Sequence, residues 1–146
     1  RWLRQSVISD MYPASLARWQ QLVTTSGACL FGIDSMPLDF LGCMNAITGW
    51  SLDYEEVVAT GKRITTLLHA FNLREGFTPS DFKLPELARG NPPLDVGGLK
   101  GVTVDSEGLK RQFYEAMGFD FETGAIDRDR ITALGLDDIL ETGERS

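Results

Sequence analysis

Asp53-Tyr54-Glu55-Glu56 opens the longest amphipathic pattern of the chain, which continues as VVATGKRITTLLHAF to residue 71. Asp53 and Glu56 have the spacing of a capping box, with Ser51 as a competing cap, and acidic residues suit the positive end of a helix. Apolar residues then recur at helical spacing. The pattern predicts a helix from about Asp53 to Phe71. The residues expected to be buried on it are Val58, Ile64, Leu68 and Phe71.

Helical signals also dominate the sequence on both sides of this stretch. Upstream they predict helices from Ser15 to about Ser26, stopped by Gly27, and from Pro37 to Ile47. Downstream they predict one helix that starts after Asp105 and stops at Gly118, and a short one capped by Asp127 that runs through Leu134. The expected core residues of these helices are Leu16, Trp19, Leu22, Val23, Phe40, Leu41, Met44, Ile47, Leu109, Phe113 and Met117.

Residues 76–104 form a long connection rich in proline and glycine. Such a composition predicts an extended, turn-rich segment, which wraps either the helical core or a neighbouring domain. No run of alternating apolar and polar residues indicates a strand. The sequence therefore predicts an all-α fold, an irregular multi-helix domain that occupies residues 1–146 as a single unit.

Composition narrows the class of partner. The 146 residues carry a net charge of -7 and a pI near 4.6, which argues against binding to nucleic acid or to an anionic membrane. No apolar run is long enough to span a bilayer. The chain opens with Arg1 and shows no signal-peptide core, so we expect a cytoplasmic piece of a larger protein whose thiols stay reduced.

The two cysteines differ in their surroundings. Cys29 ends the loop Thr24-Thr25-Ser26-Gly27-Ala28-Cys29, where Gly27 permits a tight turn. Spacing alone leaves two readings open: a small buried hydrophobe after a helix cap, or a ligand beside an anionic cofactor or cluster. Cys43 lies inside a predicted helix and is interpreted as a core residue.

Other polar residues give weaker signals. His69 stands alone without a second ligand at a suitable spacing and is interpreted as a partly exposed surface residue. Arg74 and Glu75 are expected to pair with each other or to reach a neighbouring domain. The acidic residues from Asp137 onward are interpreted as a solvated terminus, and the glycines of residues 97–101 lack the spacing of a phosphate-binding loop.

Three segments resemble the C-terminal part of the tungsten-containing aldehyde ferredoxin oxidoreductase family. They are MNAITGW (residues 44–50), RITTLLHAFNLREGF (63–77) and LKRQFYEAMGFD (109–120). Shorter matches are Asp81, Leu84-Pro85-Glu86, Thr123-Gly124 and Leu134-Gly135-Leu136. The resemblance covers most of the chain from Cys29 onward, in order and with plausible spacing.

The resemblance implies a tungsten (or molybdenum) bis-pterin cofactor beside a 4Fe–4S cluster. The family motif Asp-x-x-Gly-Leu-Cys aligns with residues 24–29, which implies that Cys29 is a cluster ligand and that Thr24, Gly27 and Ala28 contact the pterin. Ala28 stands for Leu, and Thr24 stands for the carboxylate that would accept hydrogen bonds from the pterin. A neutral hydroxyl makes a weaker contact, because charge-assisted hydrogen bonds are roughly twice as strong as neutral ones.

The implied function is that of the C-terminal domain of an enzyme that oxidises an aldehyde to a carboxylic acid and passes electrons to ferredoxin or a similar carrier. The resemblance places the other three cluster cysteines, the second pterin motif and the acid–base residues on upstream domains, so no catalytic residue is assigned here. The isolated chain is expected to be inactive and to carry no cofactor. The alternative function is a non-catalytic helical scaffold or interaction domain that has lost cofactor binding.

Overall fold

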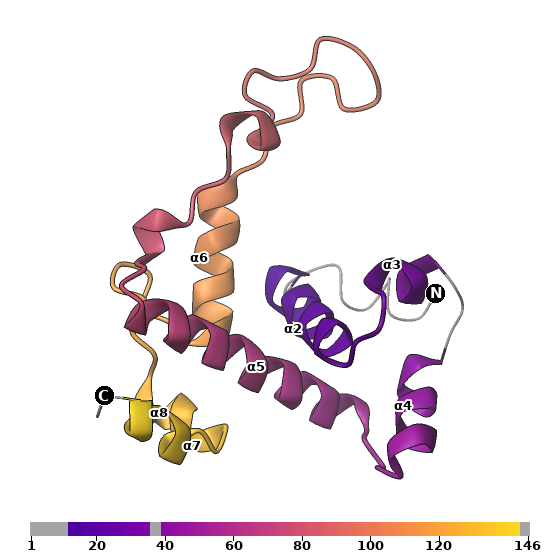
Figure 1. Ribbon diagram of the computed structural model, residues 1–146. Coiled ribbons are helices and arrows are strands. Elements are labelled where there is room, and N and C mark those ends of the chain that lie inside the picture. The colour runs from indigo at the N-terminus through magenta and orange to yellow at the C-terminus, as the bar shows by residue number, and fades with distance from the viewer. Residues whose placement is uncertain (1–11, 36–38, 144–146) are drawn as a thin grey trace.

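A computed structural model describes residues 12–35 and 39–143 (Figure 1). Its helices are α2 (Tyr12–Thr25), α3 (Leu30–Ser35), α4 (Phe40–Thr48), α5 (Tyr54–Arg74), α6 (Ser106–Met117), α7 (Arg128–Ala133) and α8 (Asp137–Gly143), with 3-10 turns η1 (Pro79–Asp81) and η2 (Glu86–Arg89). Within these residues strand pairing is limited to two isolated bridges, and no helix is long and apolar enough to cross a membrane. The all-α prediction is confirmed. The predicted helix start at Pro37 lies outside the described residues, and α3 and α8 were not predicted.

Helix α5 is the axis of the fold. The capping box is formed as predicted: the Asp53 carboxylate accepts from the Glu56 N–H, and the Glu56 carboxylate accepts from the Asp53 N–H, each at 2.9 Å. α2 packs on one side of α5, where Gly61 and Thr65 are buried. On another side the Arg63 Nε donates to the carbonyl of Leu134 at 2.8 Å. Because neighbours cover two sides of α5, the amphipathic stripe alone does not define its buried face.

Two residues of that predicted stripe are not buried. Leu68 is 48% exposed and Phe71 is 53% exposed, so their predicted burial is wrong. Leu68 lines an open groove of about 410 Å³ with Phe82 and Leu84, so its side chain is not covered by α2 or α6. Phe71 lies under the guanidinium of Arg74, 5.0 Å from the ring centroid. Val58 and Ile64 are half-buried.

The first hydrophobic cluster lies where α2, α4 and the start of α5 meet. Its buried members are Leu22, Val23, Phe40 and Val57. Trp19 packs edge-to-face on Phe40, with ring centroids 5.5 Å apart. Predicted core residues Leu41 and Met44 pack against this cluster. Ile47 does not: it is 82% exposed, because it lies on the side of α4 that has no neighbour within the described residues.

The connection from α4 to α5 is held by one side chain. The Asn45 amide donates to the carbonyl of Leu52 and its oxygen accepts from the Leu52 N–H, both at 2.9 Å. Gly49 ends α4 in the left-handed conformation, with φ at 74°. These contacts fix the angle at which α4 leaves the first cluster.

The second cluster is aromatic and lies at the other end of α5. Tyr114, Met117 and Phe119 are buried, and Phe113, Phe121 and Ile126 pack against them. α6, which carries much of this cluster, starts at the predicted cap Asp105 and ends at Gly118. Leu109 is 41% exposed, so its predicted burial is wrong, because the cluster covers only the C-terminal half of α6. Leu136 is fully buried beyond α7.

Residues 84–104 form an arm that extends beyond the N-terminal end of α6 (Figure 1). Apart from η2 it is irregular, as its proline and glycine content predicts. The arm projects away from the first cluster and does not wrap the helices of this chain.

Candidate functional site

The loop that carries Cys29 is a tight turn after α2. The Ser26 N–H donates to the carbonyl of Leu22 at 3.0 Å, and the Gly27 N–H donates to that of Thr24 at 3.1 Å. The Ser26 hydroxyl donates to the carbonyl of Val23 at 2.7 Å and accepts from the Ala28 N–H at 3.4 Å. The turn is therefore tied to the buried part of α2 by its own backbone and one hydroxyl.

Gly27 gives this loop an open face. Its φ is 79°, in the left-handed region that favours glycine, and a Cβ placed on it would meet no atom within 4 Å. The backbone is thus accessible to a group that approaches from outside. Ala28 packs against the first cluster and anchors the loop, while Thr24 is exposed in the last turn of α2.

Cys29 stands at the junction of this loop with α3. Its carbonyl accepts the first hydrogen bond of α3, from the Ile33 N–H at 3.0 Å, and its side chain is exposed. The interpretation of Cys29 as a small buried hydrophobe, one of the two that its spacing left open, is therefore wrong. The Cys29 residue is accessible from outside.

Cys43 does not behave as predicted. It is exposed on α4 and is not a core residue. The side of α4 that faces the first cluster is occupied by Phe40, Leu41 and Met44, and Cys43 lies outside that stripe. The chain therefore offers two exposed thiols, one in a glycine turn and one on a regular helix.

These residues match one ligand position of an iron–sulfur site and not the full set of ligands. A 4Fe–4S cluster generally needs four thiolates. Among the described residues, no group of three or more His, Cys, Asp or Glu side chains lies close enough together to hold a metal ion. The loop offers one exposed thiol of the kind such a cluster needs, Cys29, beside an exposed glycine turn at Gly27 and the exposed Thr24 side chain, neither of which is a thiolate ligand.

His69 belongs to the aromatic cluster. Its ring stacks on Phe119 with centroids 4.1 Å apart and an interplanar angle of 10°, and Tyr114 packs edge-on at 5.6 Å. Its Nε2 lies 2.8 Å from the carbonyl of Gly124, which can only accept, so Nε2 carries the proton. Burial lowers the pKa of His69, and the hydrogen bond to Gly124 opposes that shift. The histidine is half-buried, but its role is packing, which spacing along the sequence could not reveal.

The charged pair at the end of α5 is local. Arg74 and Glu75 form an ion pair of 3.2 Å with each other, and both side chains are about half-exposed. Exposed pairs of this kind contribute little to stability. Arg74 and Glu75 therefore pair with each other, which is the first of the two roles expected from the sequence.

Together these features define an all-helical fold with an exposed cysteine directly after a glycine turn. The chain belongs to the aldehyde ferredoxin oxidoreductase family: the family's sequence model, described as aldehyde ferredoxin oxidoreductase, domains 2 & 3, matches residues 10–136. That match includes the Cys29 loop and every helix from α2 to α7. A comparison with curated proteins gave no match.

Proposed function

We propose that this chain is the C-terminal domain of an aldehyde ferredoxin oxidoreductase-like enzyme in the cytoplasm, with residues 1–146 forming one helical domain. The reaction converts an aldehyde and water to a carboxylic acid, two protons and two electrons, and the electrons pass to ferredoxin or a similar carrier. The observation that carries the proposal is the exposed Cys29 thiol at the Gly27 turn, inside a segment that matches the family.

The chain's own residues would complete the cofactor site. The Cys29 thiolate would serve as one ligand of a 4Fe–4S cluster, while Gly27 and Ala28 bring the backbone near the pterin and Thr24 offers a neutral hydroxyl. When bound, a tungsten or molybdenum bis-pterin supplies the substrate oxidation and the cluster supplies electron transfer. The hydrogen bonds of Ser26 hold this loop in place before any ligand arrives, so little ordering is needed on binding.

Exposed apolar residues just after Cys29 and at the junction of α4 and α5 support the same arrangement. Phe31, two residues after Cys29, is 82% exposed, and Trp50 and Tyr54 are 57% and 50% exposed. Large apolar side chains left in water are typical of surfaces that another domain covers. A covering domain would also exclude water from the thiol, which favours a stable iron–sulfur bond.

The test compares the two exposed cysteines in the enzyme that contains this chain. We expect Cys29→Ser to lower the iron content and the visible absorption of the purified enzyme, because an oxygen donor replaces a thiolate on iron. Cys43→Ser is the matched control, since it makes the same chemical change on an exposed helix. Equal iron content in the two variants would end the ligand assignment.

The alternative, a scaffold that has lost cofactor binding, is favoured by one residue, Thr24, which stands where the family motif has a carboxylate. A wild-type enzyme with neither iron nor pterin would establish that alternative. Thr24→Asp separates the two functions further: it should increase pterin retention if the site is in use, and should change nothing in a scaffold.

A further inference from the structure

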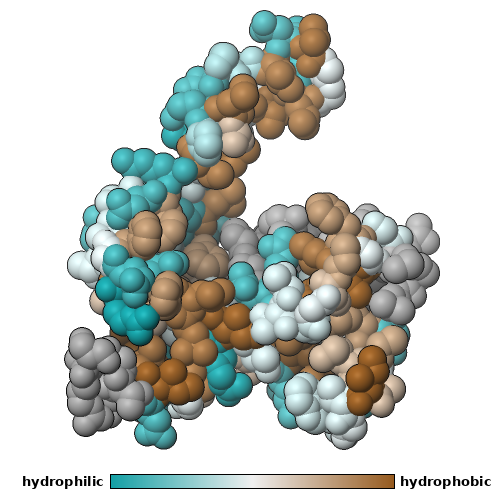
Figure 2. Space-filling view, in the orientation of Figure 1, coloured by the Kyte–Doolittle hydropathy of each residue, from teal (hydrophilic) through white to brown (hydrophobic). Residues whose placement is uncertain are grey.

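The arm (residues 84–104) exposes apolar side chains that this chain does not cover. Leu87 and Val96 are each 77% exposed and Leu99 is 64% exposed. The other exposed apolar residues of the arm are Leu84, Leu94, Val102 and Val104. Figure 2 shows these brown surfaces gathered along the arm, beyond the end of α6. Contiguous apolar surface of this kind marks an interaction site rather than an ordinary loop.

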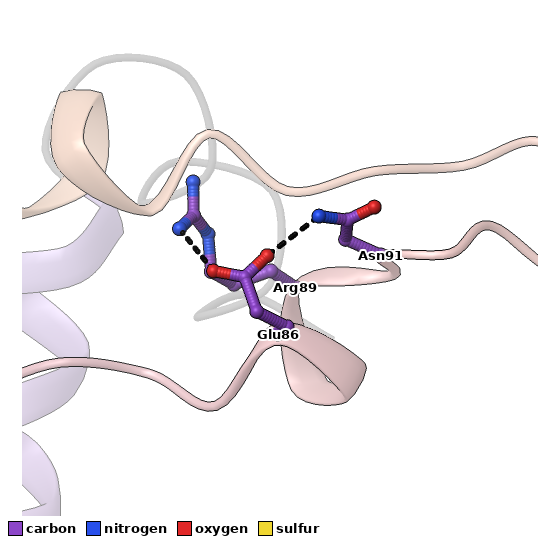
Figure 3. A network of polar contacts seen from close by, with 3 residues as sticks. All are labelled: Glu86, Arg89 and Asn91. Atoms are coloured by element: carbon purple, nitrogen blue, oxygen red, sulfur yellow. Dashed lines mark hydrogen bonds and ion pairs between the residues drawn. The ribbon is translucent and has the colours of Figure 1, made fainter.

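The arm is nevertheless ordered by its own polar contacts. At its base the Glu86 carboxylate accepts from Arg89 Nη1 at 3.1 Å and from the Asn91 amide at 2.6 Å (Figure 3). The outgoing segment is tied to the incoming one, because the Val104 N–H donates to the carbonyl of Arg89 at 2.8 Å. A frame fixed before binding loses less conformational entropy when a partner covers it.

Close packing extends this order toward the tip. The carbonyl of Val102 lies so near Gly90 that a Cβ there would be 2.5 Å from it. Farther out, the Gly101 N–H donates to the carbonyl of Leu94 at 3.0 Å. The two segments of the arm therefore support each other, and the apolar side chains are displayed on a defined shape.

The charge of the arm points to an apolar partner surface. Residues 84–104 contain two acidic side chains, Glu86 and Asp95, and two basic ones, Arg89 and Lys100, so their formal charges cancel. The whole chain carries -7, and that excess lies outside the arm. Docking by the arm would thus depend on apolar burial, and a nucleic acid or other polyanion would gain nothing from it.

We propose that the arm docks into an apolar recess of a neighbouring domain of the same enzyme. The inference rests on the proposed function, because the occupant is the remainder of an aldehyde ferredoxin oxidoreductase-like enzyme. The family match spans the whole arm and is described as domains 2 & 3, so the family's enzymes contain at least one further domain. In Figure 1 the arm and the α2–α3 unit with Cys29 extend from the same side of α5, so one neighbour can contact both.

Hydrogen–deuterium exchange of this chain alone and of the enzyme that contains it tests the proposal. Backbone amides of residues 84–104 should exchange roughly tenfold or more slowly in the enzyme, while those of α7 serve as an internal reference. Equal exchange of the arm in both samples would overturn the proposal. Slow exchange that appears in the chain alone as its concentration rises would overturn it too, and would assign the arm to a second copy.

A pair of variants at one position gives a second test. In the enzyme that contains this chain, Leu99→Asp should weaken docking of the arm, measured as roughly tenfold or more faster exchange of its amides, since burial of a leucine is worth that much. Leu99→Ile keeps the apolar surface and should exchange like the wild type. Equal exchange of the arm in the two variants would contradict the proposal. Both Leu99 variants keep Cys29, so the difference between them reports docking of the arm alone, and a failure of the cluster assignment, measured by iron content, is distinguishable from a failure of the docking assignment.

Discussion

Gly124→Ala tests how the end of α5 packs against the turn after α6. Gly124 is buried with φ at 78°, and its carbonyl accepts from His69 Nε2. A Cβ at this position would lie 2.8 Å from a methyl carbon of Leu73 and 3.3 Å from two ring carbons of Pro79. The substitution therefore adds a steric conflict to a backbone conformation that alanine adopts poorly.

Gly124→Ala has two costs, one for the left-handed backbone conformation and one for the steric conflict. An alanine in the left-handed region costs roughly 1–2 kcal/mol, and overpacking costs roughly 1–3 kcal/mol. The overpacking term should fall at the low end, because the Leu73 methyl can rotate away and the Pro79 ring needs to shift by only a few tenths of an ångström. We expect Gly124→Ala to lower the free energy of unfolding by about 2–4 kcal/mol.

Gly76→Ala is the matched control. Gly76 also has a left-handed φ, 86°, and lies just after α5, but a Cβ there would meet no atom of the described residues within 4 Å. It should cost only the backbone term, about 1–2 kcal/mol. Urea denaturation followed by helical circular dichroism measures both variants. Equal destabilisation by the two would refute the packing of Leu73 and Pro79 against Gly124.

Three further predictions follow from single contacts. His69 is the only histidine, and burial lowers its pKa, so the fold favours the neutral ring. The stability that the neutral ring contributes is present above the ordinary pKa of 6.5 and is lost as the pH falls through the folded-state pKa. We expect His69→Gln to flatten this part of the curve of stability against pH. Hydrogen bonds lower the pKa values of Asp81 and Asp120 from 3.8, so their contributions to stability are present above 3.8 and are lost as the pH falls below that value. Asn45→Ala removes both hydrogen bonds to Leu52 and should cost about 1–3 kcal/mol in urea denaturation, whereas Asn91→Ala, on the exposed arm, should cost less. The purified chain should contain no cluster, since it lacks ligands and an isolated loop gains no binding energy from metal; brown protein with about four iron atoms per chain would contradict this.

Local signals predicted the helices well. Asp53, Asp105 and Asp127 all cap helices, and Gly118 ends one, because cap and stop signals depend only on neighbouring residues. The short α3 and α8 were missed. α8 begins at Asp137 in a run of acidic residues that was interpreted as a solvated terminus.

Burial was harder to predict, because it depends on which segments meet across the chain. Leu68, Leu109 and Ile47 have the spacing of core residues, yet they are exposed because no neighbour among the described residues covers their sides of the helices. The predicted burial of Cys43 is wrong because Phe40, Leu41 and Met44 occupy the side of α4 that faces the first cluster. His69 contacts Phe119 and Gly124, which are distant in sequence, so no local pattern could indicate its role. The Cys29 assignment came from the family motif, and exposure in the structure agrees with an accessible thiol but leaves its ligand role a prediction.

The length of α5 limits where residues can be inserted into or deleted from this chain. Its 21 residues, Tyr54–Arg74, make a helix about 30 Å long, which carries Val57 in the first cluster and His69 beside the second. Successive residues of a helix are offset by about 100° around its axis. Deleting one residue from α5 would therefore rotate the aromatic cluster by that angle relative to the Cys29 loop. Insertions and deletions compatible with this architecture are confined to whole helical turns within α5, or to the loops outside it.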